Sequence, residues 1–184
     1  MGRMPEGYSI RFANQLDIPA LIAADRAASE LFRPTGLIPD MATIPESVPA
    51  EVLSAAIEMG MVLVAEDEHG PVGFALCQPR GNVLYLDQIS VDPAHGRKGL
   101  GRILMAHVYM LAEEHKLSAV VLSTFRDLPW NGPFYRRLGF REIARNKMED
   151  WMIEIETVQA ETLDVEQRCF MRRPVRRFSL RRAG

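Results

Sequence analysis

The chain is organised around residues 84–111, which read LYLDQISVDPAHGRKGLGRILMAHVYML. The apolar run that opens this stretch predicts a buried strand up to Val91. The Asp-Pro pair that follows ends the strand, because proline has no amide donor and restricts the residue before it. From Gly99 onward, apolar residues recur at the spacing of one helical face. The glycine-rich sequence HGRKGLG lies between the strand and the helix.

A glycine-rich loop that leads into a helix is suited to binding an anion. The amides of the first helical turn have no intrahelical partner, and the helix dipole adds about half a positive charge. Three glycines would let a pyrophosphate approach the backbone, and three basic residues add charge beside it. These residues are Gly96, Gly99, Gly101, Arg97, Lys98 and Arg102. A basic turn before an ordinary helix is the alternative, because glycine loops of this kind are only moderately specific.

The spacing excludes two common nucleotide-binding motifs. GxxxxGK[ST] is absent, so the loop is not a P-loop. GxGxxG is also absent, because Leu104 stands where the third glycine would be. No acidic residue stands at the end of a second parallel strand, where a ribose ligand is expected.

The stretch resembles motif A of the GNAT superfamily of acyl-CoA-dependent N-acyltransferases. ISVDP matches the family's strand signature, hhxhxVxP. GRKGLG matches its loop, [QR]xxGx[GA], except that Gly96 replaces the family's Gln or Arg. The resemblance implies a pyrophosphate cradle made by the backbone amides of Arg97, Lys98, Gly99, Leu100, Gly101 and Arg102.

The resemblance also implies a role for the central strand. In the family this strand splays from its neighbour at a bulge. The main chain of Ile89, Ser90 and Val91 is then free to pair with the pantetheine arm of acetyl-CoA, and a backbone amide there would stabilise the oxyanion. Such a donor is needed because acyl transfer develops negative charge on the thioester oxygen.

FYRRLGF, residues 134–140, resembles motif B of the same superfamily and follows motif A at a separation of roughly 35 residues. The resemblance implies that Phe134 contacts the cofactor and that Tyr135 is the acid. A phenol with a pKa of about 10 is protonated at neutral pH and can donate to a leaving thiolate. A packed tyrosine with a satisfied hydroxyl is the alternative. The family's cofactor-binding Asn position falls on Leu128, and Asn131 is the nearest substitute.

The general base has two candidate carboxylates. Asp87 is predicted to share a pleat face with Ile89 and Val91, so it could point into the cleft and take the proton of the amine. A charge on the outer face of the strand is the alternative. Glu30 is the rival, since the resemblance implies that the loop after the first helix lines the acceptor site.

Histidines and cysteines do not form a catalytic or metal-binding pattern. His95 lies in the phosphate loop, where it would contact cofactor or solvent, and His107 lies mid-helix as a packed residue. HxxxH, CxxC and acidic clusters are absent, so no metal is predicted. Cys77 and Cys169 are interpreted as buried thiols of a reducing cytosol, although sequence leaves a bridge between them open.

Residue periodicity predicts the remaining elements. Strands are expected at residues 8–13, 61–66, 72–79, 84–91, 119–124, 140–145 and 167–173, and helices at 17–31, 46–58, 99–115, 132–138 and 148–159. Asp17 is predicted to cap the first helix, and Gly139 to end the fourth. This order predicts an α/β fold, a mixed and mostly antiparallel sheet of six to seven strands with helices on both faces. It matches the GNAT order.

Composition bounds the class of protein. The 184 residues, 47% apolar and 25% charged, suit a single domain over residues 1–173. No apolar run approaches the roughly 18 residues of a membrane span, and the N-terminus lacks a secretory h-region, so a cytoplasmic location is expected. Net charge is −2, but residues 168–184 carry seven arginines and no acid. The tail at 174–184 is expected to be frayed and solvated. Nucleic-acid binding is the alternative.

Together these features predict a cytoplasmic N-acetyltransferase that uses acetyl-CoA as co-substrate and no metal. The amine of a small molecule or of a protein would attack directly in a ternary complex, and a homodimer is compatible with the fold. The rivals are a different acyl donor, a CoA-binding module without turnover, and a nucleic-acid-associated protein that uses the tail.

Overall fold

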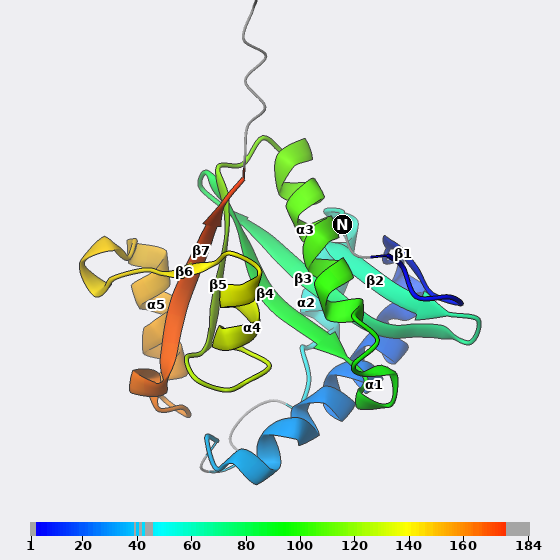
Figure 1. Cartoon of the computed structure of the whole chain (residues 1–184), viewed down its shortest axis with the longest axis horizontal. Helices are drawn as coiled ribbons and strands as arrows, with labels where there is room; N and C mark the ends of the chain where they lie inside the picture. Colours follow the sequence, from blue (N-terminus) through cyan, green and yellow to red (C-terminus); the bar gives the residue numbers. More distant parts are fainter. Residues whose placement is uncertain (1–2, 39, 41, 43–45, 176–184) are drawn as a thin grey trace, which may run out of the picture.

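The structure is a computed structural model that describes residues 3–38, 40, 42 and 46–175 (Figure 1). The strands are β1 (Ser9–Phe12), β2 (Val62–Asp67), β3 (Gly70–Arg80), β4 (Val83–Val91), β5 (Ala119–Phe125), β6 (Arg141–Glu142) and β7 (Arg168–Pro174). The helices are α1 (Ile18–Ser29), α2 (Ala50–Glu58), α3 (Leu100–Glu114), α4 (Gly132–Arg137) and α5 (Asp150–Gln159). A 3-10 helix, η2 (Glu30–Thr35), continues α1. The predicted basic tail lies outside the described residues from position 176.

The described strands form one seven-stranded sheet in the order β1-β2-β3-β4-β5-β7-β6. Neighbouring strands are antiparallel except β4 and β5, which are parallel. Helices α3 and α4 cover one face, and α1, α2 and α5 cover the other (Figure 1). The predicted mixed, mostly antiparallel sheet with helices on both faces is therefore confirmed.

The core lies on both sides of the central strands. Leu100, Leu104 and Val108 project from α3 at helical spacing into the larger apolar cluster. On the opposite face, Met152 of α5 packs in a smaller cluster, with Tyr85 of β4. The β5 sequence AVVLSTF is apolar at consecutive positions because this strand is covered on both faces.

Two predicted helix ends have different outcomes. Gly139 follows α4 with φ +88°, the left-handed conformation in which glycine ends a helix, as predicted. Asp17 precedes α1 but makes no capping hydrogen bond to it, so the predicted cap is wrong. Its carboxylate instead accepts two bonds from the Arg11 guanidinium, at 2.6 and 2.9 Å, and one from the Asn14 amide. An arginine on the neighbouring strand therefore competes successfully with the helix amides for this carboxylate.

Candidate active site

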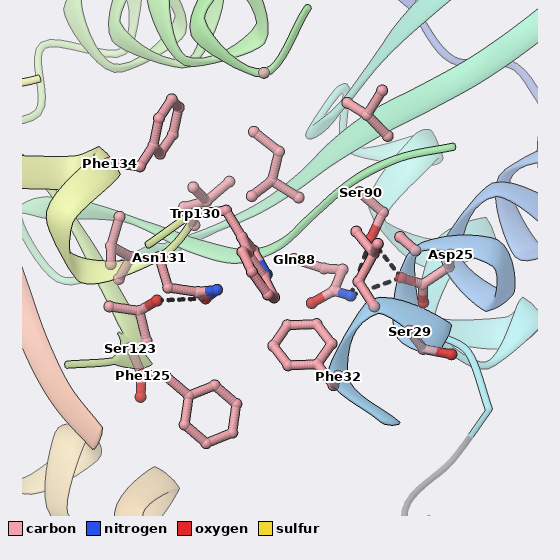
Figure 2. A pocket seen from close by; sticks show the side chains of 18 of the residues that line it. Asp25, Ser29, Phe32, Gln88, Ser90, Ser123, Phe125, Trp130, Asn131 and Phe134 are labelled. Carbon is pink, nitrogen blue, oxygen red and sulfur yellow. Dashed lines mark hydrogen bonds between the residues drawn. The ribbon is translucent and has the colours of Figure 1, made fainter. Parts of the chain in front are cut away.

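The sheet opens where β4 and β5 separate. The two strands pair from Val83 with Ala119 to Leu86 with Leu122, and no other described strand pairs with the rest of β4 on that side. At the same point a bulge interrupts the pairing of β4 with β3, with Asp87 as the extra residue. A cavity of about 1160 Å³ lies in this opening (Figure 2). Residues of α1 line it from one face of the sheet, and residues of α3 and α4 line it from the other. Pockets for a single small molecule are commonly about 300–1,000 Å³, so this cavity has room for a co-substrate and an acceptor.

The bulge changes which side chains share a face. Side chains alternate along a strand, so one extra residue moves all later side chains to the other face. Gln88 and Ser90 therefore point toward α1, on the face that also carries Asp87, while Ile89 and Val91 point toward α3. The prediction that Asp87 shares a pleat face with Ile89 and Val91 is wrong for this reason.

A buried carboxylate on α1, Asp25, holds this part of β4. Its Oδ1 accepts from Gln88 Nε2 at 2.6 Å and from Ser90 Oγ at 2.5 Å (Figure 2). Its Oδ2 accepts from the Val48 amide at 2.8 Å, so one carboxylate joins α1, β4 and the segment before α2. Asp25 is not among the residues predicted from the sequence. An acidic residue on the apolar face of a helix, four residues after the buried Leu21, is the pattern that would indicate it.

The glycine loop forms one end of the cavity. Of its predicted residues, Arg97, Gly99, Leu100, Gly101 and Arg102 line the cavity. Among the residues that the structure describes, no side chain caps the N-terminus of α3, so its first amides have no such competitor for an anion. Arg97 with φ +60° and Gly99 with φ +85° both adopt the left-handed conformation, which tightens the turn. This end of the cavity therefore fits a diphosphate.

Lys98 differs from the other basic residues of the loop. It does not line the cavity, because its ammonium donates to the Tyr8 hydroxyl at 2.6 Å and lies 5.0 Å from the centroid of that ring. The same hydroxyl lies 2.9 Å from Nδ1 of His95, which does line the cavity. His107 lies outside the cavity with Nδ1 2.9 Å from the Ile103 carbonyl oxygen, as a half-buried helix residue.

Helix α4 presents Tyr135 and Phe134 to the cavity. The Tyr135 ring packs against Phe134 and Phe140 at centroid distances of 5.1 and 5.6 Å. Burial raises the pKa of the phenol, which stays protonated at neutral pH. Within the described residues the Tyr135 hydroxyl makes no hydrogen bond, so it is available to a ligand.

Asn131 lines the cavity at the start of α4. Its Oδ1 accepts from Thr124 Oγ1 on β5 at 2.8 Å (Figure 2). This bond fixes the orientation of the amide and leaves the NH₂ group of Asn131 to donate elsewhere. Asn131 is thus held next to Phe134 and Tyr135, as a cofactor contact would need.

The structure separates the two base candidates. Asp87 lines the cavity, and its side chain is open to the cleft. The surrounding protein removes part of its hydration and so raises the pKa of its carboxyl group. Arg80 and a hydrogen bond from Gln78 act in the opposite direction, but their effect is smaller. Glu30 is exposed and lies outside the cavity. Its carboxylate pairs with the Arg33 guanidinium at 2.8 Å, which lowers the pKa of Glu30. Of the two, only Asp87 is placed to meet an acceptor.

Other chemistry finds little support in the described part of the chain. Residues 3–38, 40, 42 and 46–175 contain no group of three or more His, Cys, Asp or Glu side chains that could hold a metal. Cys77 and Cys169 are free, buried thiols, so the bridge between them that sequence left open is not formed. Burial raises the pKa of both thiols, that of Cys169 to about 11, and neither lines the cavity. None of the described helices is long and apolar enough to cross a membrane.

Known structures share this architecture. PaiA N-acetyltransferase from Thermoplasma acidophilum, in complex with coenzyme A, superposes with a TM-score of 0.72 at 16% identity, over 91% of this chain and 98% of that one. The ribosomal-protein-S18-alanine N-acetyltransferase from Escherichia coli gives 0.66 at 18% identity, over 95% and 97%. N-acetylglutamate synthase from Neisseria gonorrhoeae gives 0.69 at 17% identity, over 92% of this chain and 35% of that one.

The sequence itself also matches a known family. Residues 58–142 match the family described as acetyltransferase (GNAT) domain. The matched segment contains the bulged strand β4, the glycine loop and Tyr135, which are the features that build the cavity. Sequence motifs, sheet topology and the family match therefore agree: residues 58–142 match the GNAT acetyltransferase domain, and the chain shares the fold of these N-acetyltransferases.

Proposed function

We propose that this protein is an acetyl-CoA-dependent N-acetyltransferase that acts on an amine by direct attack in a ternary complex. The observation that carries the proposal is the unpaired edge of β4 at residues 87–91, with the glycine loop at one end and Tyr135 beside it. An extended pantetheine arm can pair with such an edge as a strand would. The complexes of PaiA N-acetyltransferase and N-acetylglutamate synthase with coenzyme A support this choice of co-substrate.

Each part of the co-substrate has a fitting group in the cavity. The amides of residues 97–102 bind the diphosphate, with Arg97 and Arg102 as counter-charges. The main chain of Ile89, Ser90 and Val91 holds the pantetheine arm and donates an amide to the thioester oxygen. Phe134 and Asn131 complete the wall beside it.

Two side chains move protons in the proposed reaction. Asp87 accepts the proton that the amine loses as its nitrogen bonds to the thioester carbon. Tyr135 donates its proton to the sulfur as the carbon–sulfur bond breaks, and its raised pKa keeps that proton in place until then. Glu30 is not proposed as the base, because its ion pair with Arg33 lies outside the cavity.

Calorimetric titration with acetyl-CoA tests the binding step. Gly101 lines the cavity in the first turn of α3, and a side chain there would meet its nearest atom, on Phe134, at 3.9 Å. Gly101→Glu and Gly101→Gln therefore add equal bulk and differ in charge. We expect micromolar binding by the wild type and at least about tenfold weaker binding by the Glu variant than by the Gln variant. Equal affinities, or no wild-type binding at tens of micromolar, would contradict the proposal.

Thiol release with a panel of amines tests turnover. Tyr135→Phe keeps the ring packing and removes the acid, so we expect kcat to fall about 100-fold or more while the acetyl-CoA Kd stays within about twofold. Tyr109→Phe is the matched control, because this half-buried tyrosine of α3, whose hydroxyl is buried, does not line the cavity. Retained CoA binding without any turnover would favour the rival reading, a binding module.

The proposal includes a cytoplasmic location and one domain over residues 1–173, followed by a basic tail. The acceptor is a small molecule or a protein amine. Removal of residues 176–184 should leave acetyl-CoA affinity unchanged, since the cavity is lined by residues 25–168. Salt-dependent binding of DNA or RNA that is lost on this removal would instead support the nucleic-acid alternative.

A further inference from the structure

An aromatic group lines the part of the cavity that lies away from the glycine loop. Phe32 of η2 packs against Phe125 of β5 at a ring-centroid distance of 5.6 Å and against Trp130 at 6.3 Å. Figure 2 shows these rings, one from η2 and two from the end of β5 and the loop that follows it, turned toward one space. Trp130 is still 44% exposed, although a large aromatic side chain stabilises a protein or a complex most when it is buried. This wall therefore offers apolar surface to an acceptor.

Arg168 of β7 reaches the same part of the cavity. Its guanidinium carbon lies 4.7 Å from the centroid of the Phe125 ring. Its Nε donates to Gln159 Oε1 at 3.0 Å and its Nη2 donates to Ser123 Oγ at 3.2 Å. These partners are neutral, and three of the five guanidinium N–H groups have no partner within the described residues.

The pairing of Arg168 contrasts with that of other arginines in the molecule. Arg11 of β1 and Arg126, just after β5, each bind a carboxylate within 2.9 Å, although their side chains are still 34% and 35% exposed. Arg168 is half-buried, and no described carboxylate lies within ion-pair distance of it. Burial accordingly lowers the pKa of Arg168. A charge removed from water without a counter-charge is costly, so the cavity lacks an anion at this position.

Asp87 supplies the opposite charge on the same face of the sheet. Tyr85 lines the cavity with both of them, and while burial raises the pKa of its phenol most, Asp87 raises it further and Arg168 lowers it. One wall of the cavity thus offers a carboxylate for an ammonium group, a guanidinium for an anion, and aromatic rings for an apolar side group. A guanidinium matches a carboxylate in shape and can donate two parallel bonds to it.

We infer that the acceptor is an amino carboxylate with an apolar side chain, whose carboxylate binds Arg168 while its amine lies near Asp87. This inference rests on the proposed function, because it names the acceptor of that reaction. Arg168 is then a residue that sets specificity. A peptide N-terminus is disfavoured, since its own carbonyl is an amide and brings no negative charge to Arg168.

The test compares matched probes on the full-length protein. L-Phenylalanine, L-phenylalaninamide and phenethylamine share the amine and the ring, and only the first carries a carboxylate. L-Leucine and L-leucinamide repeat the comparison without an aromatic ring. Binding is titrated into the protein saturated with CoA, and thiol release with acetyl-CoA gives kcat/KM. We expect the carboxylates to exceed their amides by about 10- to 100-fold in both measurements.

Variants of Arg168 separate recognition from stability. Arg168→Gln should reduce the preference for carboxylate over amide to within about twofold, and Arg168→Lys should restore part of it. Arg172→Gln, an exposed arginine of the same strand, should leave the preference unchanged. A purely structural role of Arg168 would lower all rates together without changing this ratio.

Three outcomes overturn the inference. They are equal binding of carboxylate and amide by the wild type, a preference that survives in Arg168→Gln, and no binding of any carboxylate probe at millimolar concentration. Failure of the proposed function has a different signature. In that case thiol release is absent for every probe, while the titration still reports whether the carboxylate is preferred.

Discussion

Replacement of Asp25 by alanine should destabilise the protein and disturb its active site together. The carboxylate accepts from Gln88 Nε2, Ser90 Oγ and the Val48 amide, and Asp25 itself is only 3% exposed. Asp25→Ala leaves these donors facing an apolar methyl group. Gln88 lines the cavity, where water can reach it, and its amide also donates to Ser90.

The magnitude follows from the groups left unsatisfied. Ser90 is only 4% exposed and Val48 is half-buried, and each buried donor left unsatisfied costs roughly 1–3 kcal/mol. We therefore expect the free energy of unfolding to fall by about 2–5 kcal/mol. For a chain of this length, each kcal/mol lowers Tm by about 2–4 °C, so a fall of roughly 5–15 °C is expected.

The matched variant is Asp25→Asn. The asparagine keeps the size of the side chain, and its oxygen can still accept from the Val48 amide. Its new NH₂ group faces Ser90 Oγ, which can accept, and Gln88, whose amide can turn to present its oxygen. We expect this variant to lose less than half of the stability lost by Asp25→Ala.

Thermal melts and guanidinium denaturation measure the effect, with the denaturant slope m as a check that the same surface unfolds. Acetyl-CoA titration is the second readout, because Gln88 and Ser90 flank the main chain of Ile89 in the proposed pantetheine edge. We expect affinity to fall at least about threefold in Asp25→Ala. A Tm within about 2 °C of the wild type, at unchanged m, would refute the reasoning, since it would mean that the three donors need no carboxylate.

Three further changes test other parts of the molecule. Asp87→Asn should lower kcat/KM by about 100-fold or more and remove the acid limb of its pH profile. The pKa of Asp87 is raised in the folded state, so the wild type loses stability as the pH rises through that pKa and the carboxylate becomes charged. The uncharged Asn variant avoids this loss and should have a Tm at pH 7 no lower than that of the wild type. Arg11→Gln should lower the free energy of unfolding by about 2 kcal/mol at pH 7, as measured by denaturant titration. The loss should become smaller as the pH falls through the lowered pKa of Asp17, because the carboxylate that pairs with Arg11 is then protonated. Gly132→Ala would place Cβ 2.0 Å from a backbone oxygen and should abolish the cooperative melt, whereas Gly101→Ala, at 3.9 Å from its nearest neighbour, should retain it.

Periodic features of the fold could be predicted from sequence because each repeats a local rule. The apolar run of β5 indicated a strand covered on both faces, and the 3.6-residue spacing after Gly99 indicated α3. Both elements have the predicted type and lie within two residues of the predicted bounds. Conformation at single positions was also predictable where only glycine fits easily, as at Gly139 with φ +88°.

The bulge at Asp87 could not be predicted from the residues of β4. Alternation predicts side-chain direction only in a regular strand, and one extra residue reverses the face of every side chain after it. The extra residue is defined by the partner strand, since Leu76 pairs with Gln88 and Cys77 with Leu86. No property of Asp87 itself distinguishes a bulged residue from a paired one, so the resemblance to a family, rather than the pattern, carried the expectation of a bulge.

Asp25 and Arg168 were missed for a related reason. Arg168 is an ordinary charged residue in its own segment, and Asp25 is marked there only by its place on the apolar face of α1. The significance of each depends on partners 63–65 residues away for Asp25 and 45 residues away for Arg168. The two residues differ in how they are satisfied. Asp25 has a donor for both oxygens from within the chain, as expected of a residue that stabilises the fold. Arg168 has neutral partners and N–H groups to spare, as expected of a residue whose counter-charge arrives with a ligand. The balance of charge around a half-buried group therefore distinguishes a structural ion from a binding one, and that balance exists only once the chain has folded.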